Sequence, residues 1–220
     1  MQRKPAKAII NYLIFVAILA WAGLAIQLYI IISNRLVSIP ETIVRYFSYF
    51  TILSNILVAL YSTYILLKPY CRLGKYFSRS NVVAAITLYI TVVGIIYNAI
   101  LRNLWSPKGL EMVGDELTHL IVPLSFLLYW LILVPKDELK WKDSFPWLIY
   151  PIVYFSWVII FGALSGFYPY FFVNVTELGY NKVILNSGML VIGFFLLSLL
   201  FIGIDKLMKP KLSITSPDAD

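Results

Sequence analysis

Apolar residues in this chain gather in six long runs separated by short polar stretches. A helix needs about 20 mostly apolar residues to cross the hydrocarbon layer of a bilayer. Pro146 begins the fifth run, where proline suits the first turn of a helix. The pattern therefore predicts an all-α, polytopic membrane protein with six transmembrane helices. Their predicted ranges are residues 8–33, 47–67, 82–101, 117–134, 146–164 and 183–204.

The loops between these runs are short, so the chain is predicted to be one domain. We expect the transmembrane domain to cover residues 1–211 and a polar, disordered tail to cover residues 212–220. Composition agrees, because 60% of the residues are hydrophobic and only 13% are charged. Soluble domains have about 45–50% apolar and roughly 25% charged residues. No aqueous region is large enough for nucleic acid, despite the net charge of +7.

Basic residues are divided unevenly between the loops. Thirteen of the 18 Lys and Arg residues precede the first run, follow the sixth, or lie after the second and fourth runs. The alternate loops hold the other five, which are Arg35, Arg45, Arg102, Lys108 and Lys182. Loops rich in Lys and Arg stay in the cytoplasm. Both termini are therefore predicted to be cytoplasmic, in a multi-pass protein of the cell membrane.

The chain has one cysteine, Cys71, and one histidine, His119. A single cysteine excludes an internal disulfide. One cysteine and one histidine also fall short of a zinc site, which takes three or four such ligands. The sequence predicts no metal and no cofactor, and no pattern in it specifies an oligomeric state.

The predicted topology brings polar residues of three helices into the outer leaflet. Polar groups at membrane depth usually face the bundle interior or a cavity, and they indicate a functional site. The i, i+3, i+7 spacing in the second run puts its polar residues on one helical face. These residues are Ser48, Thr51 and Asn55 in the second run, Asn98 and Arg102 at the end of the third, and Asp115, Glu116 and His119 at the start of the fourth.

Residues of these types can carry out nucleophilic catalysis. A histidine side chain titrates near neutral pH and serves as a general base. Asp115 or Glu116, one turn before His119, can orient its ring. The hydroxyl of Thr51 or Ser48 can then be the nucleophile.

The remaining polar residues are predicted to bind or orient the substrate. Arg102 and Asn98 can hold a carboxylate or an oxyanion. An unpaired charge at membrane depth costs roughly 2.5–3.5 kcal/mol. We therefore expect Arg102 to lie within reach of Asp115 or Glu116.

Each of these residues also has a purely structural interpretation. His119 can be a wet interfacial residue at a helix start, and Arg102 can reach the headgroups from a helix end. Ser and Thr in membrane helices often bond backbone or neighbouring helices. Asp115 and Glu116 suit the dipole of a helix N-terminus. The alternative to an enzyme is thus a transporter or lipid-binding scaffold with His119 as a proton-sensitive gate.

Four segments occur in the order FSYFTILSNILVAL, YNAILRNLW, DELTHLIVPLSFLLYW and SGFYPYFF. Together they resemble the bacterial six-helix membrane proteins of the Pr-six-Pr family. That family is distantly similar to the androgen-induced protein/ADTRP family of animals, whose members are threonine hydrolases of fatty acid esters of hydroxy fatty acids. The resemblance implies a lipid esterase that acts on membrane lipids or lipid-like molecules.

The resemblance also implies which residues react. The family histidine precedes a short apolar run and a proline, which matches His119 and Pro123. The family threonine lies in an aromatic and apolar stretch near a helix start, which matches Thr51 in YFTIL. Ser48 in YFSYF is the alternative in a shifted register. The animal proteins carry further histidines near the site, and this chain has none.

Overall fold

The computed structural model describes residues 7–104 and 106–208, and these are helical without a strand. Six helical segments are long and apolar enough to cross a membrane, which confirms the predicted fold class and helix number. The protein is therefore a six-helix, multi-pass membrane protein. The predicted tail, residues 212–220, lies outside the described residues. The six spans are Lys7–Ser33, Phe50–Leu67, Ser80–Leu104, Leu110–Leu133, Trp141–Ser165 and Tyr180–Leu207.

Several spans consist of consecutive helical pieces, where η denotes a short 3-10 or π-helical piece. The continuous spans are α1 (Lys7–Ser33), α3 (Phe50–Leu67) and α11 (Tyr180–Leu207). The composite spans are α5 (Ser80–Ile96) with η1 (Tyr97–Leu101) and η2 (Arg102–Leu104), α6 (Leu110–Glu116) with η3 (Leu117–Ile121) and α7 (Val122–Leu133), and η4 (Trp141–Asp143) with α8 (Ser144–Trp147) and α9 (Ile149–Ser165). Short elements outside the spans are α2 (Ile39–Phe47), α4 (Arg72–Phe77), η5 (Phe171–Val173) and α10 (Val175–Leu178).

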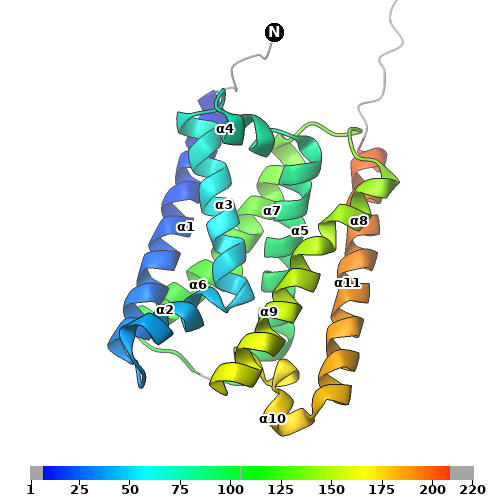
Figure 1. Cartoon of the computed structure of the whole chain (residues 1–220). Coiled ribbons are helices and arrows are strands. Elements are labelled where there is room, and N and C mark those ends of the chain that lie inside the picture. Colours follow the sequence, from blue (N-terminus) through cyan, green and yellow to red (C-terminus); the bar gives the residue numbers. More distant parts are fainter. Residues whose placement is uncertain (1–6, 105, 209–220) are drawn as a thin grey trace, which may run out of the picture.

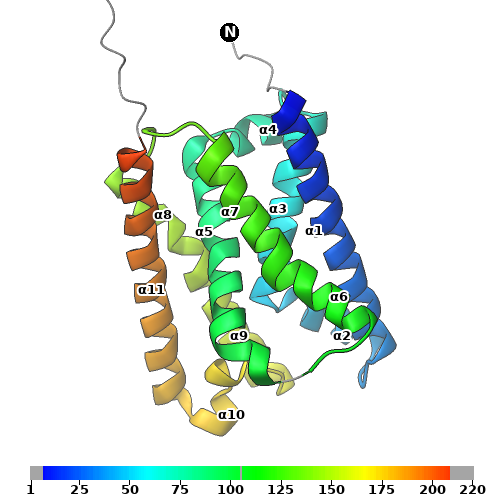
Figure 2. The same cartoon turned by 180° about the vertical axis from the view of Figure 1, so that it is seen from behind.

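The spans form one bundle around α5 (Figures 1 and 2). Helix α1 packs against α3, and α5 packs against α3, α7 and α11. The start of α1 and the end of α11 lie at the same end of the bundle as α4, whereas α2 and α10 lie at the other end (Figure 1). We call this other end the α2 end.

The outer surface of the bundle is apolar, as expected for contact with lipid. Ile18 on α1, Ile132 on α7 and Leu196 on α11 are 62%, 71% and 59% exposed. In the interior, Phe126 and Trp130 are buried. Lipid hydrocarbon offers no hydrogen-bonding partner, and the backbone N–H and C=O groups of a helix bond to one another instead. The fold thus exposes apolar side chains outward without exposing backbone.

Two predicted helix starts at the α2 end are wrong. The fourth span begins at Leu110 and not near residue 117, so His119 lies well inside it. Asp115 and Glu116 consequently do not occupy a helix N-terminus, and the dipole interpretation loses its basis. The early start escaped prediction because residues 110–116 mix apolar and acidic residues.

The second span begins at Phe50 rather than near residue 47. Helix α2 ends at Phe47, and Tyr49 is extended with φ −86° and ψ 125°. The backbone N–H of Ser48 bonds to Arg45 O at 3.0 Å and closes the end of α2. Ser48 therefore lies outside the helix that carries Thr51 and Asn55.

Candidate active site

The π-helical turns η1 and η3 are in contact near the α2 end, and η3 leaves two carbonyl groups without helical partners. In η3 the N–H of Val122 bonds to Leu117 O, one residue further back than in an α-helix. The carbonyl of Thr118 is thereby released. Pro123 has no N–H to donate to the carbonyl of His119. Such single π-turns are rare and frequently lie at functional sites.

Two asparagines from neighbouring helices satisfy the released carbonyls. Asn55 of α3 donates from Nδ2 to Thr118 O at 3.0 Å. Asn98 of η1 donates from Nδ2 to His119 O at 3.1 Å. Since a buried carbonyl without a partner is costly, these amides hold η3 in place between α3 and η1. Both predicted site residues thus lie beside His119 and position its backbone.

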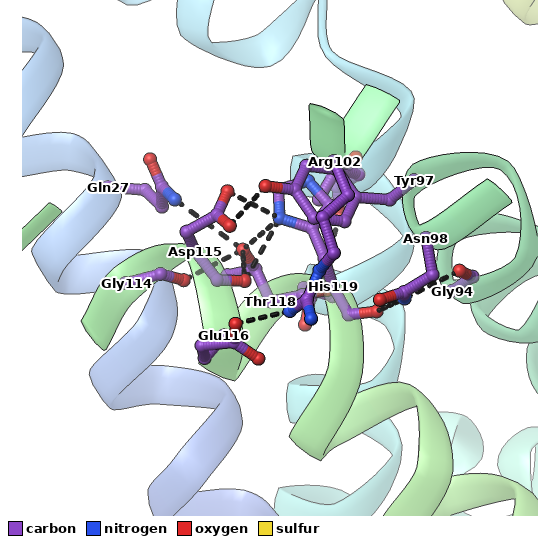
Figure 3. A network of polar contacts seen from close by, with 12 residues as sticks. Gln27, Gly94, Tyr97, Asn98, Arg102, Gly114, Asp115, Glu116, Thr118 and His119 are labelled. Atoms are coloured by element: carbon purple, nitrogen blue, oxygen red, sulfur yellow. Dashed lines mark hydrogen bonds and ion pairs between the residues drawn. The ribbon is translucent and has the colours of Figure 1, made fainter. Parts of the chain in front are cut away.

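The imidazole of His119 is held by oxygen atoms around Nδ1 (Figure 3). Nδ1 lies 3.1 Å from Oδ1 of Asp115, 3.0 Å from Asp115 O and 3.2 Å from Oγ1 of Thr118. The Thr118 hydroxyl donates its proton to Gly114 O at 2.9 Å, so its oxygen is left to accept. Three acceptors around Nδ1 assign the ring proton to that atom. Nε2 is then the unprotonated nitrogen that can act as a base.

Tyr97 of η1 completes the setting of the imidazole. Its ring stacks on the His119 ring with centroids 3.8 Å apart and planes inclined by 17°. Its hydroxyl donates to Oδ2 of Asp115, the oxygen that does not face the imidazole. Asp115 is thus bonded on both sides and can only present Oδ1 to His119. Nothing in the sequence alone singled out Tyr97, because one more tyrosine at a helix end looks like part of an interfacial aromatic belt.

Arg102 lies near the ring of Tyr97 and forms an ion pair with Glu116. The pair confirms the expectation that Arg102 reaches one of the two acids. The side chains are 37% and 35% exposed. Neither residue is among the described residues that line the cavities below. The geometry therefore supports a role for this pair in joining η2 to α6.

A cavity of about 610 Å³ opens beside His119 and is lined by Thr51, His119 and Asp115. Its other walls come from the end of α1, from α2 and from the loop over residues 167–171. Pockets for small molecules typically measure about 300–1,000 Å³. The cavity is thus large enough for part of a lipid-sized molecule, and it joins the two residues predicted to react.

Thr51 and Ser48 have different surroundings. Thr51 lies in the first turn of α3, is 8% exposed and lines the cavity. The Ser48 hydroxyl donates to Val44 O at 2.8 Å and accepts the indole N–H of Trp157 at 3.1 Å. Ser48 is fully buried and is not among the described residues that line either cavity. The geometry favours Thr51 as the nucleophile.

Tyr170, in the loop between α9 and α11, lies directly against Thr51. Its hydroxyl is 3.4 Å from the backbone N of Thr51 and 3.4 Å from Oγ1 of Thr51. Behind the pair lies a second, apolar cavity of about 40 Å³, walled in part by Phe155 and Phe194. Thr51 and Tyr170 line both cavities. A signal for Tyr170 existed in SGFYPYFF, since so aromatic a loop has to be covered by the protein or the membrane.

Comparisons with known proteins give no further assignment. No family model matches this chain, and neither a curated protein nor a solved structure matches it. Within residues 7–104 and 106–208, no three metal-ligating side chains converge. The function therefore has to be argued from the geometry around His119 and Thr51.

Proposed function

We propose that this protein is a membrane ester hydrolase in which Thr51 is the nucleophile, His119 the general base and Asp115 the residue that orients the base. One observation carries the proposal: Thr51 and the His119–Asp115 pair line the same cavity of about 610 Å³. A hydroxyl, a base and a group that orients the base are the parts that nucleophilic hydrolysis needs. The motif resemblance to the Pr-six-Pr family, which is distantly similar to threonine hydrolases, supports the choice of Thr51 and His119.

The proposed reaction has two halves. Oγ1 of Thr51 attacks the ester carbonyl carbon while its proton passes to Nε2 of His119. The tetrahedral intermediate collapses, the C–O bond to the alcohol breaks, and His119 returns the proton to the leaving oxygen. Water then attacks the acyl-threonine with His119 again as the base, releasing the carboxylic acid and the Thr51 hydroxyl.

Asp115 supports both halves without taking the proton itself. Its Oδ1 accepts from Nδ1 of His119 and keeps the ring in the tautomer with a free Nε2. When Nε2 becomes protonated, the carboxylate stabilises the imidazolium. A buried pair gains more from this attraction than an exposed pair, because the local dielectric constant is low.

The substrate class follows from the position of the cavity in the bundle. Thr51 and His119 lie near the α2 end, which the Lys and Arg distribution assigns to the outer side of the cell membrane. A lipid ester carries its reactive bond at this depth, between a polar headgroup and apolar chains. We therefore propose membrane lipids or lipid-like fatty-acyl esters, such as fatty acid esters of hydroxy fatty acids, as substrates.

The test is hydrolysis of p-nitrophenyl octanoate by the purified protein in detergent. Thr51→Ala should abolish turnover, and His119→Ala should lower it by roughly 10²–10⁴-fold, the usual share of acid–base catalysis. Both variants should remain folded by thermal unfolding. The matched control is Ser48→Ala, which removes a nearby hydroxyl that does not line the cavity and should change turnover little.

Two outcomes contradict the proposal. One is a wild-type protein that is folded but hydrolyses no ester. The other is a His119→Ala protein with wild-type turnover. In either case a transporter or lipid-binding scaffold, with His119 as a proton-sensitive gate, becomes the better explanation of the cavity.

A further inference from the structure

The proposed reaction places a negative charge on the former carbonyl oxygen of the ester, and that charge needs a hydrogen-bond donor. Asn98 and Arg102, the donors expected from the sequence, are used elsewhere: Asn98 bonds to two backbone carbonyls and Arg102 to Glu116. The polar group that does reach Thr51 from another element is the hydroxyl of Tyr170.

The Tyr170 side chain is fixed by aromatic neighbours. Its ring stacks on Phe172 with centroids 5.2 Å apart and planes 5° from parallel. Tyr49, just before α3, meets the same ring edge-on at 5.9 Å. A group that is already in place before the reaction starts has no reorganisation to undergo when charge develops. The hydroxyl is therefore preorganised beside Thr51.

The hydroxyl of Tyr170 is also in the right state to donate. Its oxygen accepts from the backbone N–H of Thr51. Burial raises the pKa of the phenol, so the group keeps its proton at neutral pH. The neighbouring Tyr154 hydroxyl gives its own proton to Ser48 O at 3.0 Å and can only receive one from Tyr170. Tyr170 thus has a single O–H, for which the oxygens of Tyr154 and Thr51 are both acceptors in the free protein, and which an oxyanion formed beside Thr51 can accept in their place.

We propose that Tyr170 is a catalytic residue that donates a hydrogen bond to the oxyanion formed when Thr51 attacks the ester. The inference rests on the proposed function. As the bond from Oγ1 to the carbonyl carbon forms, the carbonyl electron pair moves to oxygen, and Tyr170 stabilises it without losing its own proton. When the intermediate collapses, the pair returns to the carbon and the alcohol leaves with the proton from His119.

The distances agree with this role. An oxyanion donor lies about 2.7–3.1 Å from the oxyanion itself. The oxyanion and the attacking oxygen are bonded to the same carbon, so such a donor has to lie close to the attacking oxygen as well. The Tyr170 hydroxyl is 3.4 Å from Oγ1 of Thr51. Tyr170 also lines the large cavity, so a carbonyl bound there can reach its hydroxyl.

The test compares Tyr170→Phe with the wild type, using p-nitrophenyl octanoate as substrate and octylboronic acid as a mimic of the tetrahedral intermediate. Tyr170→Phe should lower kcat by about 10²–10³-fold, as loss of one oxyanion donor does. KM should be unchanged, and inhibition by the boronic acid should weaken by the same factor as kcat. Binding of a non-hydrolysable octyl ether should not change, since an ether develops no oxyanion.

The matched control is Tyr150→Phe. The Tyr150 hydroxyl also lies 3.4 Å from a hydroxyl, Oγ of Ser54, but Tyr150 is not among the described residues that line either cavity. It should leave kcat and boronic acid inhibition at wild-type values. If Tyr170→Phe does not purify as a folded protein, 3-fluorotyrosine at position 170 replaces it, and kcat should then change with the acidity of the phenol.

The outcomes separate this inference from the proposed function. Turnover that depends on Thr51 and His119 but is retained in Tyr170→Phe overturns the role of Tyr170 alone. A parallel rise in KM and in the ether dissociation constant, with kcat unchanged, also overturns it, because that pattern indicates a structural role. Absence of Thr51-dependent turnover in the wild type overturns the proposed function and this inference together.

Discussion

At the scale of single residues, the contact between Asp115 and His119 supplies the negative charge beside the base. Asp115 Oδ1 is 3.1 Å from Nδ1 and is the charged one of the three acceptors around that nitrogen. An asparagine at position 115 keeps the size of the side chain but removes this charge. The imidazolium that forms when Nε2 accepts the proton of Thr51 would then lose its carboxylate partner.

We therefore predict that Asp115→Asn lowers kcat for ester hydrolysis by roughly 10²–10⁴-fold, the size of a general-base contribution. Steady-state kinetics on purified protein measure this directly. Glu116→Gln is the control. It removes the same charge at the next position of the chain, from an acid that pairs with Arg102 and not with His119. If kcat of Asp115→Asn stays within a fewfold of kcat of Glu116→Gln, the carboxylate beside Nδ1 is not needed.

At the scale of elements, the loop between α9 and α11 packs onto a glycine of α9. The ring of Tyr168 packs onto Gly162 so closely that a Cβ atom at position 162 would overlap it. Arg45 of α2 lies 4.6 Å from the ring centroid of Phe167, on the same loop. The docking of this loop is what brings Tyr170 to Thr51.

Gly162→Ala should consequently destabilise the protein by about 1–3 kcal/mol, the usual cost of overpacking, and should lower turnover by displacing the loop. Thermal unfolding and hydrolysis measured on one preparation test both effects. Gly193→Ala is the matched control, because a Cβ atom at position 193 of α11 meets nothing within 4 Å. Equal unfolding temperatures for the two variants would contradict the docking of Tyr168 on Gly162.

The elements differ in how well the sequence predicts them. The apolar runs predict the six spans because length and hydropathy alone decide whether a helix can cross a membrane. The π-turns η1 and η3 could not be predicted, since one extra residue in a turn leaves the apolar pattern unchanged. The end of one helix and the start of the next around Ser48 could not be predicted either, because aromatic residues continue the apolar run on both sides of Ser48.

The candidate site was predicted only in part. The sequence indicated Thr51, His119 and Asp115 because their chemistry and their shared leaflet could be read from the topology. Asn55 and Asn98 were expected to contact substrate, but in the structure their amide nitrogens bond to backbone carbonyls. Tyr97 and Tyr170 were missed. Their roles depend on distances between helices, and such distances are not contained in a one-dimensional pattern.

At the scale of the whole molecule, the Lys and Arg distribution predicts that the α4 end faces the cytoplasm and the α2 end the outside. Six spans bring the start of α1 and the end of α11 to the same end (Figure 1). With this predicted orientation, the cavity lined by Thr51 would lie in the outer leaflet. Reversed insertion would expose the same site to cytoplasmic lipids.

Labelling of single cysteines in intact cells tests this orientation. Cys71→Ser provides the background, and serine should replace Cys71 well because the thiol caps α4 by accepting from Gly74 N. In that background, Lys108→Cys should react with a membrane-impermeant maleimide from outside. Lys142→Cys should react only after the cells are permeabilised. The reverse pattern would place the active site at the cytoplasmic face.

The most direct measurement is the mass of the purified protein after reaction with a fluorophosphonate, which bonds covalently to an activated hydroxyl. We predict a single phosphonyl adduct in the wild type, located on Thr51 by peptide mapping. The adduct should be absent from Thr51→Ala and should form much more slowly in His119→Ala, while Ser48→Ala should label like the wild type. A wild-type protein that acquires no adduct, or a Thr51→Ala protein that is labelled as fast as the wild type, would contradict the account.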